Sequence, residues 1–348
     1  MKSSSEGDEP RPAAKSGGIL ERLRNGPVLG DGGYVLELER RGYVQAGPYT
    51  PEVAIEHPEA LRQLHMEFLR AGSEVLQTLS FYGTADKLES AGQARHVVEI
   101  NRAAVAIARQ VAGDSALVAG DVTMTLLFRS GDRNANKRVR AVIEQQVALQ
   151  QEAGVDFLIG ETFIHLEEAL IALQAIRQSK LPAMITMNIG HGGSRDGHSP
   201  EECARKLTGE GAAIVGVNCS YDPTVLLEVA RRMKSVVDVP VACQPLAYAT
   251  PDPETPFTEL KEFPLALDSR QLSRYTMAEF ARRARDSGID YIGGCCGVVA
   301  HHIRAMAEAL GRKPPASAKS PALSKHGLAS VREKASEGFW RDQEQVPS

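Results

Sequence analysis

The pattern that decides the fold is clearest in the stretch AGVDFLIGET, residues 153–162. A glycine that can close a helix is followed at once by a short apolar run, and a carboxylate stands where that run ends. Glycine readily supplies the left-handed residue after a helix C-terminus, so Gly154 indicates a helix-to-strand turn. The same arrangement recurs at Gly72, Gly211 and Gly288, which predicts a chain built from repeated β–α units.

Extending this pattern along the chain gives eight apolar runs that qualify as strands, with helical periodicity between them. We predict strands over residues 28–30, 75–79, 117–120, 157–160, 183–187, 214–217, 239–243 and 291–293. Eight such units favour a closed α/β barrel of the (β/α)8 or TIM type over an open doubly wound sheet. In barrels of this type the active site lies at the carboxyl ends of the strands.

The remaining parts of the 348-residue chain fit one barrel with extensions. We predict a disordered leader over residues 1–18, because this segment is rich in Ser, Pro, Gly and charged residues. The barrel then spans residues 19–312, and residues 313–348 form a linker and a short helical tail. The tail carries the single tryptophan, Trp340, which is either an edge contact or an anchor for a partner subunit in a homo-oligomer.

The composition excludes several classes of protein. Apolar residues make up 43% of the chain, yet no run approaches the roughly 18 apolar residues that a membrane span needs. The net charge is −4 and the basic residues are scattered, which argues against nucleic acid as a partner. The N-terminus also lacks the apolar region of a signal peptide. We therefore expect a cytoplasmic protein that acts on small molecules.

The five cysteines, an odd number, make a poor disulfide framework and suggest metal binding or catalysis. Cys219 follows the sixth predicted strand, and Cys295 and Cys296 follow the eighth, so all three reach the same rim. A catalytic zinc site keeps three protein ligands, often thiolates, and leaves a fourth position open. We predict that these three cysteines bind Zn²⁺. The alternative is that they are small buried hydrophobic residues, which is our interpretation of Cys203 and Cys243.

Two further strand ends carry carboxylates. Glu161 ends the fourth strand, where a buried carboxylate should meet a cation, either a substrate ammonium or a structural Arg or Lys. Asp31 ends the first strand and allows the same two interpretations, or it shapes the turn. Gly32 and Gly33, which follow it, leave backbone N–H groups free to receive an anion such as a carboxylate.

Aromatic residues are scarce, at 5%, yet Tyr34, Tyr49, Phe81 and Tyr82 gather after the first two strands. Aromatic faces attract quaternary ammonium groups, with about 0.5–2 kcal/mol for each contact. A methylated cation could bind there, and ordinary packing at the rim is the alternative.

Three motifs together resemble the homocysteine S-methyltransferase family: DGG (31–33), VNC (217–219) and GGCCG (293–297). More stretches resemble its betaine–homocysteine S-methyltransferase subgroup over roughly residues 26–311. They are RGYVQAGP (41–48), QT (77–78), FY (81–82), FLI (157–159), QPLAY (244–248) and EFP (262–264).

The resemblance implies roles for the strand-end residues. The three cysteines would be the zinc ligands, Glu161 and Asp31 would belong to the L-homocysteine site, and Tyr82 would occupy the open position of the metal before substrate arrives. Thr162 and Gln244 would also contact substrate. The chain departs from the subgroup at Tyr49, where the subgroup has Trp, and at Thr162, where it has Tyr. Both positions belong to the region that encloses betaine.

The expected activity is therefore zinc-dependent methyl transfer from betaine to L-homocysteine, which gives dimethylglycine and L-methionine. The two departures leave a sulfonium donor open, such as dimethylsulfoniopropionate, another thetin or S-methylmethionine. A protein of another class also remains open, namely a zinc-thiolate redox sensor without turnover.

Overall fold

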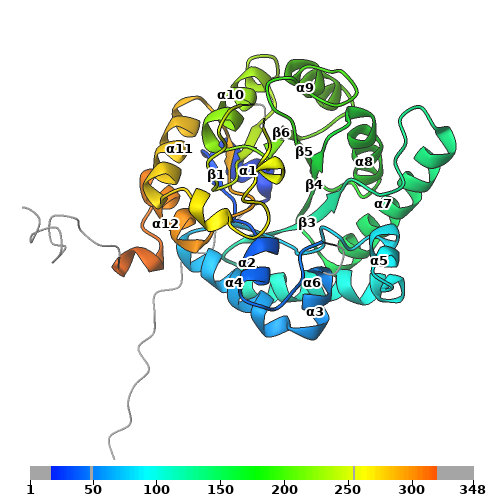
Figure 1. Cartoon of the computed structure of the whole chain (residues 1–348), viewed down its shortest axis with the longest axis horizontal. Helices are drawn as coiled ribbons and strands as arrows, with labels where there is room; N and C mark the ends of the chain where they lie inside the picture. The colour runs from blue at the N-terminus through cyan, green and yellow to red at the C-terminus, as the bar shows by residue number, and fades with distance from the viewer. Residues whose placement is uncertain (1–16, 48–49, 254, 320–348) are drawn as a thin grey trace, which may run out of the picture.

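The computed structural model describes residues 17–47, 50–253 and 255–319. Within these ranges a ring of eight parallel strands is surrounded by helices, which confirms the predicted (β/α)8 barrel (Figure 1). The strands are β1 Val28–Leu29, β2 Val75–Gln77, β3 Leu117–Thr123, β4 Phe157–Phe163, β5 Ala183–Met187, β6 Ile214–Asn218, β7 Val241–Gln244 and β8 Tyr291–Ile292. Almost all of the predicted leader and most of the predicted tail, including Trp340, lie outside the described residues, so both stay predictions.

The strands form one parallel sheet in the order β1-β8-β7-β6-β5-β4-β3-β2. At the gap between β1 and β2, the backbone N–H of Glu74 donates to the carbonyl of Leu29 at 2.8 Å, which joins the two ends of the sheet. Because all strands run parallel, their carboxyl ends meet at one rim. Residues far apart in the sequence are brought together there.

The outer layer is a ring of helices in which each packs beside the next and α12 packs against α4 (Figure 1). Its members are α4 Pro58–Ala71, α6 Val97–Ala112, α7 Arg133–Ala153, α8 Leu166–Gln178, α9 Pro200–Gly209, α10 Pro223–Lys234, α11 Arg274–Asp286 and α12 Ala300–Ala309. Gly72 and Gly154 end α4 and α7 with φ of 112° and 93°, as the sequence pattern predicts. Across the described ranges, no helix combines the length and apolarity that a membrane span requires.

The barrel interior is filled at the end opposite the carboxyl rim. Val75, Phe157 and Tyr291 are buried together inside the ring. The short helix α1, Ile19–Arg24, adds Ile19 and Leu23 to the same cluster and so covers the amino ends of the strands. The carboxyl rim is therefore the end that remains for substrates.

The observed strands differ from the predicted ones mainly in length. β3 and β4 end at Thr123 and Phe163, three residues beyond the predicted ends, and β7 begins two residues later than predicted, at Val241. Backbone pairing continues through polar residues at the rim, as the register of Thr123 with Glu161 shows. Glu161 and Thr162 therefore lie within β4 rather than after it. The pairing of β4 in the sheet thus holds the backbone of both residues.

Candidate active site

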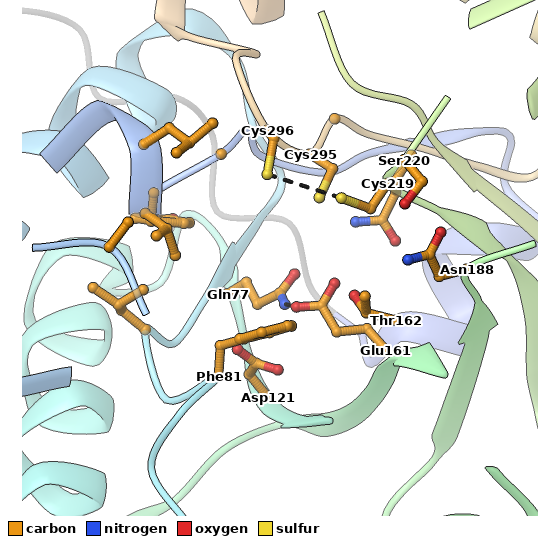
Figure 2. Close-up of a pocket in the computed structure, with 18 of the residues that line it drawn as sticks. Gln77, Phe81, Asp121, Glu161, Thr162, Asn188, Cys219, Ser220, Cys295 and Cys296 are labelled. Atoms are coloured by element: carbon orange, nitrogen blue, oxygen red, sulfur yellow. Dashed lines mark hydrogen bonds between the residues drawn. The ribbon is translucent and has the colours of Figure 1, made fainter. Parts of the chain in front are cut away.

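A cavity of about 410 Å³ lies at the carboxyl rim and gathers most of the predicted site (Figure 2). The predicted residues that line it are Gly32, Gly33, Tyr34, Phe81, Tyr82, Glu161, Thr162, Cys219, Gln244, Cys295 and Cys296. Asp31 is absent from this lining, and Tyr49 lies outside the described residues. Figure 2 shows the three cysteines along one edge and the carboxylates across the cavity from them.

The three cysteines are spaced for one metal ion. Their Sγ atoms all lie within 4.8 Å of one another, and those of Cys219 and Cys296 are 3.8 Å apart. A tetrahedral zinc with bonds of about 2.3 Å would hold two sulfurs about 3.8 Å apart. The pKa of Cys219 is lowered, first of all by its interactions with the neighbouring thiols of Cys295 and Cys296. The cluster can therefore supply a thiolate and three sulfur ligands for one metal ion at the wall of the cavity.

The glycines after β1 allow the cysteine turn to come this close. A Cβ atom on Gly32 would lie 2.3 Å from the carbonyl oxygen of Val298, and one on Gly33 would lie 2.5 Å from that of Cys295. The backbone N–H of Gly33 donates to the carbonyl oxygen of Val298 at 2.9 Å. The prediction that this N–H is free for a substrate carboxylate is therefore wrong, because the turn has taken it. For Gly32, the contact between its N–H and a substrate carboxylate stays a prediction.

Glu161 is buried and held by two amides. Gln77 donates from Nε2 to Oε1 at 2.6 Å, and Asn218 donates from Nδ2 to Oε2 at 2.9 Å. Burial, followed by the neighbouring charge of Asp121, raises the pKa of Glu161. No cation is within ion-pair distance of this carboxylate in the described part of the chain, so a structural Arg or Lys does not explain it.

Asp121 belongs to the cavity, although the sequence analysis did not single it out. It is 2% exposed, it lines the cavity, and Figure 2 places it beside Phe81 on the side of Glu161. Burial raises its pKa to about 7, against lowering effects from Glu161 and Lys87. The sequence could have indicated this position, because Asp121 directly follows the predicted strand that ends at residue 120. Glu161 follows the strand that ends at residue 160 in the same way.

Asp31 lies behind the lining rather than in it. Its Oδ2 accepts the hydroxyl of Tyr34 at 2.5 Å and the backbone N–H of Gln77 at 2.7 Å. These contacts hold two lining residues, so the geometry gives Asp31 a supporting position. Its direct contact with homocysteine stays a prediction.

Thr162 adopts a backbone conformation that is unfavourable for a β-branched residue, with φ of 64°. Asn218 holds it there: the N–H of Thr162 donates to Oδ1 at 3.0 Å, and Nδ2 donates to the Thr162 hydroxyl at 2.7 Å. The same Nδ2 reaches Glu161. Asn218 therefore couples two predicted substrate contacts, a role that its place in the VNC motif alone did not reveal.

The aromatic wall of the cavity is formed by Phe81 and Tyr82, whose ring centroids are 4.8 Å apart in an edge-to-face arrangement. The Nζ atom of Lys87 lies 4.9 Å from each centroid. The pKa of Tyr82 is raised to about 12, first by burial and then by the charges of Cys296 and Cys219. Tyr82 is thus a neutral hydroxyl close to Cys219 and Cys296 at neutral pH.

The loop after β7 adds aromatic residues that the sequence analysis did not assign to the site. Phe257 and Phe263 line the cavity and pack edge to face, with centroids 5.5 Å apart. Phe263 was quoted only as part of the family resemblance. The length of this loop, between β7 and α11, was the signal that could have pointed to a cover over the rim.

Side-chain amides from the outer helices fix the loop that carries the aromatic wall. Asn101 of α6 donates to the carbonyl of Gly83 at 2.8 Å, and Gln146 of α7 donates to that of Ser80 at 2.8 Å. Both ends of the loop are thereby tied to the barrel. Phe81 and Tyr82 are held in place by contacts outside the cavity.

Replacing Asn101 with alanine should lower the free energy of unfolding by about 2–3 kcal/mol, because buried hydrogen-bonding groups lose their partner. Urea unfolding of the purified protein measures this. Arg102→Ala is the control, since the neighbouring side chain is 54% exposed and its ion pair with Glu152 should contribute less than about 1 kcal/mol. Equal effects from the two substitutions would contradict the anchoring role of Asn101.

The sequence and the fold of this chain are similar to those of known proteins. The homocysteine S-methyltransferase family model matches residues 28–310. Betaine–homocysteine S-methyltransferase 1 of Mus musculus is 46% identical over 347 residues, which cover 93% of this chain and 84% of the relative. The S-methylmethionine–homocysteine S-methyltransferase of Pongo abelii is 42% identical over 347 residues, which cover 95% of this chain and 93% of the relative.

A solved structure shows the same fold. The metallated form of the homocysteine methyltransferase MmuM from Escherichia coli matches with a TM-score of 0.68 and 20% identity, over 83% of this chain and 99% of that one. The family model covers the whole barrel, and the relatives match over nearly the full chain. This chain therefore belongs to the homocysteine S-methyltransferase family.

Proposed function

We propose that the chain transfers a methyl group from betaine to the sulfur of L-homocysteine, with zinc held by Cys219, Cys295 and Cys296. The observation that carries this proposal is the convergence of three thiols on a cavity that also presents Glu161 and an aromatic wall. The family and the names of the relatives support the same reaction.

The donor set supports zinc as the metal. Three sulfur ligands with one open position are typical of a catalytic thiolate site, and their spacing fits tetrahedral bonds. When bound, zinc ionises a coordinated thiol, which is otherwise mostly protonated at pH 7 with a pKa near 8.5.

The residues of the chain position the two substrates around this sulfur. Glu161 binds the ammonium group of homocysteine, and Gly32 offers its backbone near the carboxylate. Phe81, Tyr82 and Phe257 exclude water and attract the onium group of the donor. The sulfur then forms a bond to the methyl carbon as the carbon–nitrogen bond breaks, and the electron pair stays on nitrogen. The products are methionine and dimethylglycine.

Exclusion of water favours this step because the donor loses its positive charge in the transition state. A dry aromatic cavity disfavours the charged donor more than the neutral amine that leaves. The burial of Cys219 and the place of Phe263 in the cavity lining fit this requirement.

A sulfonium donor is the second candidate, and Thr162 is the observation that favours it. The side chain at this position lines the cavity and is smaller than the Tyr of the betaine-dependent subgroup. One relative is named for S-methylmethionine as the donor.

The expected result is methionine formation with kcat/KM for betaine at least about tenfold above that for dimethylsulfoniopropionate or S-methylmethionine. The measurement uses purified zinc-loaded protein, homocysteine and each donor in parallel, with a donor-free reaction as control. Turnover with a sulfonium donor but not with betaine would contradict the first proposal and support the second candidate. Absence of methionine with every donor would favour the redox sensor.

A further inference from the structure

Lys87 is a buried cation that the reaction described above does not use. It lies on α5, Ala85–Ser90, and it is 2% exposed. An ammonium group carries three N–H donors, yet the only hydrogen bond of Lys87 among the described residues runs to the carbonyl oxygen of Phe81, at 3.5 Å. No carboxylate in the described ranges lies within ion-pair distance of its Nζ atom. A buried charge with so few partners is costly, so its position points to a role other than stability.

The aromatic wall stands between this charge and the cavity. The Nζ atom lies 4.9 Å from the ring centroid of Phe81 and 4.9 Å from that of Tyr82. Both rings line the cavity, whereas Lys87 does not, so the ammonium group contacts the wall from behind. The π electrons that would attract a cation in the cavity are therefore already engaged by Lys87.

The ammonium group is the main form of Lys87 at pH 7. Burial lowers its pKa to about 8, against the raising effects of Asp86, Asp121 and Glu168. An onium donor on the cavity side of the wall would face this second positive charge through the rings. Two like charges so placed repel appreciably, because little water lies between them to screen the interaction.

We propose that Lys87 acts through the aromatic wall to weaken the binding of the positively charged methyl donor, and thereby to favour the loss of that charge during methyl transfer. This inference rests on the proposed function, because it takes an onium compound as the donor. The repulsion is greatest while the donor carries its full charge and fades as the methyl group leaves, so it raises the ground state more than the transition state. Lys87 is thus a positioning residue of the wall that also sets how well the cavity distinguishes a charged donor from a neutral molecule of the same shape.

The test compares betaine with 3,3-dimethylbutanoate, in which a carbon atom replaces the positive nitrogen. Both carry the same carboxylate, so any attraction between Lys87 and that group cancels in the comparison. The KM for betaine and the inhibition constant of the analogue against betaine are measured at pH 7 with zinc-loaded protein and saturating homocysteine. Lys87→Met should raise the ratio of the inhibition constant to the KM by about 3- to 20-fold and lower kcat at least about threefold.

Three further variants separate the charge of Lys87 from its packing. Lys87→Arg keeps the charge and should leave the ratio within about twofold of the wild-type value. Asn101→Ala loosens the loop of the wall without changing its charge, so it should affect both ligands alike. Lys234→Met is the matched control, because this lysine pairs with Asp290 at 2.8 Å outside the cavity and should change neither constant.

Melting temperature and zinc content show whether each variant is folded, and Lys87→Gln serves in place of Lys87→Met if only the former is folded. An unchanged or lower ratio, a kcat that does not fall, or an equal rise of the ratio in Lys87→Arg would overturn the role of Lys87 alone. If the protein used dimethylsulfoniopropionate instead of betaine, the same ratio would be measured with its neutral counterpart, 4-methylpentanoate. A wild-type protein that turns over no onium donor would overturn the proposed function, and this inference with it.

Discussion

Replacing Cys295 with alanine is expected to release the zinc and to lower the rate of methionine formation by more than about 100-fold. The site offers three cysteine ligands, so the variant would retain only two. Loss of residues that merely support a metal ligand already costs about 10- to 100-fold, and loss of a ligand should cost more. Elemental analysis of the purified variant gives the zinc content, and the rate is measured with betaine and homocysteine at saturation.

The matched control is Cys203→Ala. Cys203 is buried on α9, with its thiol 3.8 Å from the carbonyl oxygen of His198, and it does not line the cavity. This variant should keep both zinc and activity. If Cys295→Ala kept one zinc per chain, or if it turned over normally without zinc, the cysteine cluster would not be the catalytic centre.

The fold was predictable because its signals are local and repeated. Gly72 and Gly154 adopt positive φ where they close a helix, and each stands three residues before the start of an apolar strand. This pattern of a glycine followed by an apolar strand can therefore be recognised from the sequence alone. Strand ends were less predictable, because backbone pairing at the rim continues through polar residues such as Glu161, where apolar periodicity has already stopped.

The site was predictable in part, since the position of a residue at a strand end places it on the rim. This argument brought together Cys219, Cys295 and Glu161, which do line one cavity. It could not tell which rim residues face inward. Asp31 and Asp121 both follow apolar runs, yet the first turns behind the lining and the second enters it. That difference depends on how neighbouring strands and loops pack, which a linear pattern does not encode.

Replacing Glu161 with glutamine is expected to lower kcat/KM for homocysteine by about 30- to 4,000-fold. A buried ammonium that loses its carboxylate partner costs about 2–5 kcal/mol, and each 1.4 kcal/mol corresponds to a factor of ten. The amide would also present an NH2 group to Gln77 or Asn218, both of which donate to the present carboxylate. Initial rates of methionine formation over a range of homocysteine concentrations measure the effect.

The control for this substitution is Glu168→Gln, which changes a buried carboxylate of similar exposure outside the cavity. Glu168 accepts from the backbone and hydroxyl of Thr125, at 2.7 and 2.9 Å, so its loss should affect stability rather than homocysteine recognition. Zinc content should remain unchanged in both variants, because neither residue belongs to the cysteine cluster. The KM for homocysteine therefore separates two roles for Glu161: a rise at constant zinc content indicates recognition of the ammonium group. A loss of zinc with unchanged affinity for homocysteine would instead assign Glu161 to the support of the metal centre.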